Sequence, residues 1–241
     1  MTTKQRFEKI LSYFDRGFTE VNTGSSSEKN LTTTQKIFEA QSELKFDSPF
    51  QLLIAVMLSA QCTDKRVNLV TPALFAAYPT PEALAKATKE EVLTYIHSVS
   101  YPNSKAEHLI AMSKRLVEVY GGQVPDNRED LQTLAGVGRK TANVVCAVQW
   151  QQPTMAVDTH IFRVCERLGL TTNSKSPRQT EDQLVRYIPA ELIPKAHHWL
   201  LLHGRYICQA RKPLCTTCDL APYCRYFQKN QSMLALPLRY H

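Results

Sequence analysis

The sequence lacks several features that define common classes of protein. Its longest apolar run, residues 52–58, falls well short of the ~18 residues that a membrane-spanning helix needs. The first residues contain no apolar segment of the kind that secretory signals carry. No segment recurs at a fixed period, and no stretch alternates apolar and polar residues as a half-buried strand does. These absences argue against a membrane span, a secretory signal and a solenoid, and they predict an all-α protein of the cytoplasm.

Acidic residues are the minority among the charged side chains. Twenty-nine Lys and Arg stand against 22 Asp and Glu, which leaves a formal net charge of +7. This surplus favours a polyanionic partner, most simply nucleic acid, although a basic protein without such a partner can have the same balance. Hydrophobic residues make up 43% of the 241 residues, a content typical of globular proteins with one large domain or two small ones.

Paired cysteines of a secreted disulfide framework are also absent, since the chain has seven cysteines. Four of them crowd near the C-terminus, at Cys208, Cys215, Cys218 and Cys224. Four thiolates this close suit a tetrahedral zinc ion or a cubane iron–sulfur cluster, and spacing alone does not separate the two; disulfides are less favoured in an intracellular chain. The first loop between them carries Arg211 and Lys212, which can contact a phosphate backbone or simply face solvent.

Helical periodicity recurs along the chain and is interrupted by short proline and glycine breaks. Residues 17–34 are polar and low in complexity, and they predict a mobile loop or insertion. Helices are expected at residues 4–15, 50–60, from 89 onward, after Asn103 as far as Gly121, and at 128–134, 139–150, 159–168, 178–187 and 190–203.

A glycine turn at residues 134–142 has the pattern of two helices joined by a hairpin. Gly136 and Gly138 allow the backbone to turn tightly and to approach a ligand closely. Their amides, with the positive end of the next helix, make a site for one phosphate. Lys140 follows Arg139 in the first turn of that helix, and a lysine there can act as a nucleophile on a sugar or only bind phosphate.

Two further polar side chains are candidates for work on a nucleotide. Asp158 can accept a proton from Lys140 or stabilise positive charge on a sugar, and it can equally cap the helix expected at 159–168. Gln61 follows the apolar helix, where its amide can hydrogen-bond a base that has lost its partner, or only the local backbone.

In their order, these segments resemble the endonuclease III family of DNA glycosylases, within the helix–hairpin–helix superfamily. The resemblance covers the chain from about Gln41 and rests on residues 53–64, 103–106, 136–145, 156–164, 197–199, 202–206 and the four cysteines. It implies that the cysteines hold a [4Fe–4S] cluster, that Lys140 is the nucleophile and that Asp158 is its partner. Two positions depart from the family pattern: Ala135 stands where proline is usual, and Tyr101 aligns with a leucine that wedges into the duplex.

The resemblance also implies an all-α fold of two helical domains with the DNA cleft between them. A six-helix barrel domain with the hairpin is expected at residues 42–152, and an iron–sulfur cluster domain at residues 1–41 with 153–241. Lys140 and Asp158 are expected to face each other across the cleft. The residues expected to contact DNA are Gln61, Tyr101, Gly136, Gly138, Arg139, Arg211 and Lys212.

The implied function is that of a bifunctional DNA glycosylase/AP lyase of base excision repair. Such an enzyme removes oxidised pyrimidines from duplex DNA and cleaves 3′ to the abasic site by β-elimination through a lysine Schiff base. The expected partner is double-stranded DNA with damaged pyrimidines or abasic sites. The protein is expected to be a monomer, to have no membrane partner, and to act in the cytoplasm in association with a bacterial-type nucleoid.

Three alternatives remain, two of them enzymes related to this family and one a protein of a different functional class. One is a pyrimidine-dimer or mismatch-thymine glycosylase. Another is a non-catalytic DNA-binding protein that keeps the hairpin only for phosphate contact. An adenine glycosylase that acts opposite oxidised guanine is disfavoured, because such enzymes typically lack the hairpin lysine and continue into a further C-terminal domain.

Overall fold

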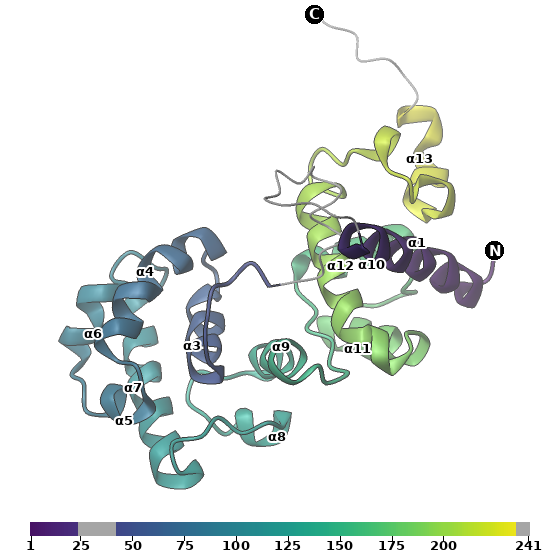
Figure 1. The fold of residues 1–241 in the computed structure, drawn as a ribbon. Helices are drawn as coiled ribbons and strands as arrows, with labels where there is room; N and C mark the ends of the chain where they lie inside the picture. Colours follow the sequence, from purple (N-terminus) through teal and green to yellow (C-terminus); the bar gives the residue numbers. More distant parts are fainter. Residues whose placement is uncertain (24–41, 235–241) are drawn as a thin grey trace, which may run out of the picture. The chain divides into compact units, whose positions relative to one another are not determined.

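The computed structural model describes residues 1–23 and 42–234, and every regular element in these residues is a helix (Figure 1). The chain divides into two compact units, Ser42–Ala156 and Met1–Gln41 with Val157–His241. The predicted all-α fold class is confirmed. No helix in the described ranges is both long and apolar enough to cross a bilayer.

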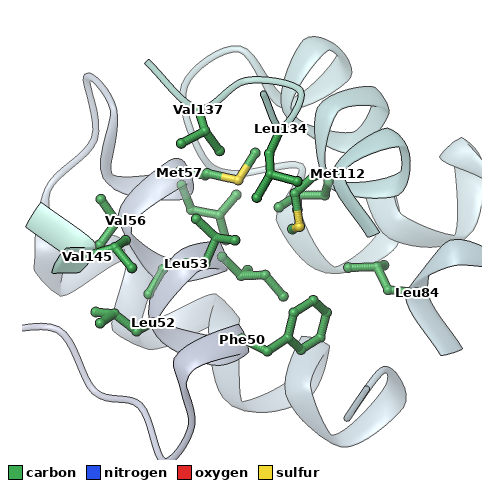
Figure 2. Packing of buried hydrophobic residues seen from close by; sticks show 14 of the residues in the cluster. Phe50, Leu52, Leu53, Val56, Met57, Leu84, Met112, Leu134, Val137 and Val145 are labelled. Carbon is green, nitrogen blue, oxygen red and sulfur yellow. The ribbon is translucent and has the colours of Figure 1, made fainter. Parts of the chain in front are cut away.

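In the unit Ser42–Ala156, the almost entirely apolar helix α3 packs against α4, α7 and α9. The elements are α3 (Pro49–Ser59), α4 (Asp64–Ala77), α5 (Pro81–Ala85), α6 (Lys89–Ile96), α7 (Pro102–Tyr120), α8 (Arg128–Leu131) and α9 (Arg139–Trp150). Ser48 caps α3 by accepting a hydrogen bond from the Gln51 N–H, and Pro49 at the first position fixes φ for helix entry. Figure 2 shows Leu53 and Met57 of α3 packed with Met112 and Leu134. The apolar sequence therefore makes α3 the centre of the core.

The ends of the neighbouring helices follow local rules. Thr88 and Glu91 form the expected capping box at the start of α6. α7 ends at Gly121, whose φ of 58° lies in the left-handed region that favours glycine. α7 begins at Pro102, earlier than the start expected after Asn103, because proline is well accommodated in the first turn of a helix.

The other unit combines α1 with the C-terminal part of the chain. Its elements are α1 (Thr3–Thr23), α10 (Thr159–Leu168), α11 (Pro177–Tyr187), η1 (Ala190–Leu192), α12 (Ile193–Tyr206), η2 (Cys215–Thr217), η3 (Ala221–Tyr223) and α13 (Arg225–Leu234). α1 buries Phe7, Ile10 and Phe14, and the Phe14 ring stacks on Trp199 of α12 with 5.7 Å between centroids. This packing joins the two ends of the described chain in one core.

The prediction of a loop over residues 17–34 is wrong for its first part, because α1 continues to Thr23. Gly17 disfavours a helix by only ~1 kcal/mol relative to alanine, and no proline follows it before Thr23. Residues 24–34 lie outside the described ranges.

Candidate functional site

The glycine hairpin connects α8 to α9. Gly136 has a φ of 74°, and a Cβ at this position would lie 2.9 Å from the Cβ of His108, so only glycine fits. The backbone N–H of Val137 donates to the Leu134 carbonyl over 3.1 Å, and the Val137 side chain is buried in the core. The turn is therefore held in one conformation at the entrance to α9.

Gly138 is the N-cap of α9 and faces open space. As a glycine it provides no side-chain cap, and no atom lies within 4 Å of where a Cβ on Gly138 would be. The N–H groups of the first turn of α9 therefore receive no acceptor from the side chain of the N-cap residue. Such a helix N-terminus suits an anion like a phosphate group.

Lys140 is the second residue of α9, and its side chain is exposed. Its position puts a primary amine within the first turn of the helix, beside the candidate phosphate site. Arg139 precedes it and is half-buried. An amine near a bound phosphate can reach the adjoining sugar, as the covalent chemistry of a lysine nucleophile requires.

Asp158 is the N-cap of α10. Its Oδ1 accepts a hydrogen bond of 2.8 Å from the N–H of Ile161, so the capping role is confirmed. The cap orients the half-buried carboxylate and does not use its second oxygen, Oδ2. Lys140 and Asp158 belong to different units, so their pairing stays a prediction from the family resemblance.

Gln61 and Tyr101 lie on two loops that a hydrogen bond joins. Both residues have a φ of 54°, a left-handed conformation that costs energy for a side chain with a Cβ. Gln61 is exposed, and 65% of Tyr101 is accessible to solvent. The hydroxyl of Ser100 donates to the Gln61 carbonyl over 2.6 Å. Two exposed residues that are predicted to contact DNA thus lie on neighbouring loops, and both have a strained backbone conformation.

All four clustered cysteines line one hollow, together with apolar side chains such as Leu168 and Phe227. The four are free thiols. Among the described residues, no three Cys, His, Asp or Glu side chains converge tightly enough to hold a single metal ion. Four cysteine thiols around one hollow are a donor set that suits a tetrahedral zinc ion or an iron–sulfur cluster.

Burial raises the pKa of the Cys218 thiol to about 12. Burial thus favours the neutral thiol over the thiolate at this position. The Nε2 of His203 lies 3.9 Å from the Cys218 sulfur and is a possible donor to it.

Arg167 holds the loop between the first two cysteines and was not identified from the sequence. Its guanidinium lies 3.5 Å from the Cys208 sulfur and donates to the carbonyls of Gln209 and Ala210 over 2.7 and 2.9 Å. Arg211 and Lys212, which follow directly, are exposed. The only signal in the sequence was a basic residue in the last turn of the expected helix 159–168.

Comparisons with known proteins identify the class of this site. The family model for HhH-GPD superfamily base excision DNA repair proteins matches residues 54–190. Endonuclease III of Haemophilus influenzae and of Escherichia coli K12 are each 49% identical over 187 residues, which cover 78% of this chain and 88% of theirs. A solved structure of a trapped endonuclease III–DNA covalent intermediate is 38% identical, with a TM-score of 0.83 over 96% of this chain and 100% of the other.

The fold and the helix–hairpin–helix site thus define a base-excision-repair protein of the HhH-GPD superfamily. Within this superfamily the chain belongs to the endonuclease III family of DNA glycosylase/AP lyases. The predicted family, enzyme class and DNA partner are confirmed.

Proposed function

We propose that this enzyme removes oxidised or ring-saturated pyrimidines from duplex DNA and then cleaves the strand 3′ to the abasic site. The observation that carries the proposal is the exposed Lys140 amine in the first turn of α9, directly after a hairpin that ends in the N-cap glycine Gly138. A phosphate bound by the N–H groups of this turn would bring the neighbouring sugar to the amine.

The base must leave the helical stack before the amine can reach its sugar, which costs a few kcal/mol. Lys140 Nζ then attacks C1′, and the bond from C1′ to the base breaks as the base departs with the electron pair. Ring opening and loss of a proton from nitrogen give a Schiff base. The imine acidifies the C2′ hydrogen, and loss of this proton breaks the C3′–O bond and expels the 3′ phosphate. Water later hydrolyses the imine and frees the lysine.

Asp158 supplies the negative charge that these reaction steps require. Its carboxylate stabilises the positive charge that develops on the sugar as the base leaves, and it accepts a proton from the attacking amine. The hydrogen bond from the Ile161 N–H to Oδ1 supports this role, because it fixes the carboxylate before substrate binds.

The remaining predicted residues hold the DNA. Gly136, Gly138 and Arg139 bind phosphate at the start of α9, and Gln61 with Tyr101 occupies the gap left by the extruded nucleotide. Arg211 and Lys212 contact the phosphate backbone from the loop that Arg167 holds.

Cys208, Cys215, Cys218 and Cys224 hold a [4Fe–4S] cluster in the hollow that they line. When bound, the cluster links residues 208–224 to one rigid centre through four iron–sulfur bonds. The enzyme acts as a monomer in the cytoplasm, on DNA of a bacterial-type nucleoid.

Asp158→Asn tests the assigned chemistry, because the amide oxygen of asparagine keeps the helix cap while the charge is lost. We expect base release from a duplex with one oxidised pyrimidine to fall by about two orders of magnitude or more. Cleavage of a preformed abasic site should fall less, because no base has to be expelled. Gel assays with and without prior base removal measure the two steps. Equal losses in both steps would contradict the role given to the carboxylate.

A further inference from the structure

Lys105 is a buried lysine that the proposed chemistry does not use. It lies on α7, it is 8% exposed, and its amine donates to the carbonyls of Leu58 and Ala60 over 2.7 and 2.8 Å. These carbonyls lie at the end of α3, where backbone acceptors lack partners within the helix and the helix dipole is negative. Lys105 therefore caps the C-terminus of α3 from a neighbouring helix.

The cap lies directly before Gln61. Ala60 donates its N–H to Met57 and accepts from Lys105, so both of its backbone groups are engaged before the chain enters the left-handed Gln61. The Gln61 carbonyl then accepts from the Ser100 hydroxyl, and Ser100 is the residue before Tyr101. One run of hydrogen bonds thus extends from Lys105 through both loops.

The same helix supports both loops, because Lys105 and Tyr101 lie on the first turn of α7. The N–H of Lys105 donates to the Tyr101 carbonyl over 3.1 Å, while its side chain reaches α3. Left-handed conformations of non-glycine residues persist only when their surroundings hold them in place. Here the surroundings include the Lys105 amine and the Ser100 hydroxyl, beside the backbone bond from the Cys62 N–H to the Ser59 carbonyl.

We propose that Lys105 and Ser100 are positioning residues that hold Gln61 and Tyr101 as one rigid pair of probes for the space left by an extruded nucleotide. This inference rests on the proposed function. A preformed pair pays no ordering cost when it enters the duplex, so it makes extrusion of the nucleotide more favourable.

A comparison of duplex with single-stranded abasic DNA tests this role. Single-stranded DNA has no opposite base and no stack to fill, so its reaction with Lys140 does not need the two probes. We expect Lys105→Met to lower the rate of borohydride trapping on duplex abasic DNA about tenfold or more, and Ser100→Ala about threefold. Both variants should trap single-stranded abasic DNA at the wild-type rate.

Two matched variants serve as controls. Lys89→Met also replaces a lysine with methionine, but it breaks a surface ion pair, in which Lys89 Nζ lies 2.6 Å from Oε1 of Glu107. Glu107 lies on α7, the helix that carries Lys105. Ser59→Ala removes a hydroxyl bond of 2.9 Å to the Val56 carbonyl within α3. Neither of these side-chain bonds involves a residue of the Gln61 or Tyr101 loop, and neither substitution should change the ratio of duplex to single-strand trapping.

The outcomes separate the two proposals. Wild-type protein that forms no adduct with either DNA would overturn the proposed function and, with it, this inference. If the wild type forms adducts with both DNAs and the Lys105 and Ser100 variants keep the wild-type ratio of duplex to single-strand trapping, only the inference is overturned. Equal losses on both DNAs in both variants would also overturn it, because they would show a general loss of folding or chemistry.

Discussion

The unit Ser42–Ala156 and the cysteine-bearing segment 207–224 are stabilised in opposite ways. The first has a continuous apolar core around α3, in which Leu53, Ile54 and Leu58 have no exposed surface. The second contains only the short turns η2 and η3, and it is tied to the rest of its unit by hydrogen bonds from arginines to backbone carbonyls. Its four cysteines line a hollow and form no disulfide.

Hydrophobic burial therefore suffices to stabilise the unit Ser42–Ala156 but contributes little to segment 207–224. Each buried aliphatic side chain of α3 contributes roughly 1.5–3 kcal/mol through removal from water. Segment 207–224 has few such side chains, since Leu220 and Cys224 are its buried apolar residues. If its cysteines hold the proposed cluster, the fold of this segment depends on that group, and the two regions should respond differently to the same kinds of change.

The largest expected effect is the loss of order in segment 207–224 after Cys215→Ser. A serine oxygen is a poor substitute for a thiolate, so the cluster and its visible colour should be lost. Hydrogen exchange should show amides of 207–224 exchanging quickly, while amides of α3 keep their protection. If colourless, metal-free protein protects 207–224 as well as the wild type does, the contrast between the regions is wrong.

Leu53→Ala tests the other side of the comparison. Deleting a fully buried leucine in the centre of α3 should lower the free energy of unfolding by about 2–5 kcal/mol, through lost burial and the cavity left behind. The absorbance of the cluster should not change. The matched substitution Leu69→Ala, at a side chain that is 64% exposed, should change stability by less than about 0.5 kcal/mol. Similar effects from both would contradict a core centred on α3.

The smallest expected effect concerns the loop that the cysteines and Arg167 hold. If Arg211 and Lys212 contact phosphates, Arg211→Ala and Lys212→Ala should each weaken binding to damaged and undamaged duplex equally. The slope of log affinity against log salt should fall by about 0.9 for each lost contact. Lys9→Ala, on α1, removes the same charge elsewhere and should leave the slope unchanged. An unchanged slope in the loop variants would show that these side chains are only solvated.

Helices that local rules determine were predictable from the sequence. The expected ranges 139–150 and 159–168 coincide with α9 and α10, because Gly138 and Asp158 mark their starts. The extension of α1 through residues 17–23 was not predicted, because polar composition was taken as evidence of a loop although no residue there stops a helix.

The parts of the site that depend on distant contacts could not be predicted. The spacing of the cysteines predicts a metal centre, and the hairpin pattern placed Lys140 in the first turn of a helix, since the residues of each motif lie close together in sequence. Lys105 and Arg167 looked like ordinary helix-surface cations, and their roles arise only when carbonyls from another part of the chain meet them. The left-handed conformation of Tyr101 likewise has no signal in its residue type.

Borohydride trapping of wild-type and Lys140→Gln protein on duplex DNA with one abasic site tests the assigned nucleophile most directly. The wild type should form a stable covalent adduct, and Lys140→Gln should form none while it still binds the DNA through the N–H groups of the hairpin. Lys86→Gln, at an exposed lysine of the same unit, should trap like the wild type. A borohydride-dependent adduct with Lys140→Gln would show that another amine is the nucleophile and would contradict the mechanism.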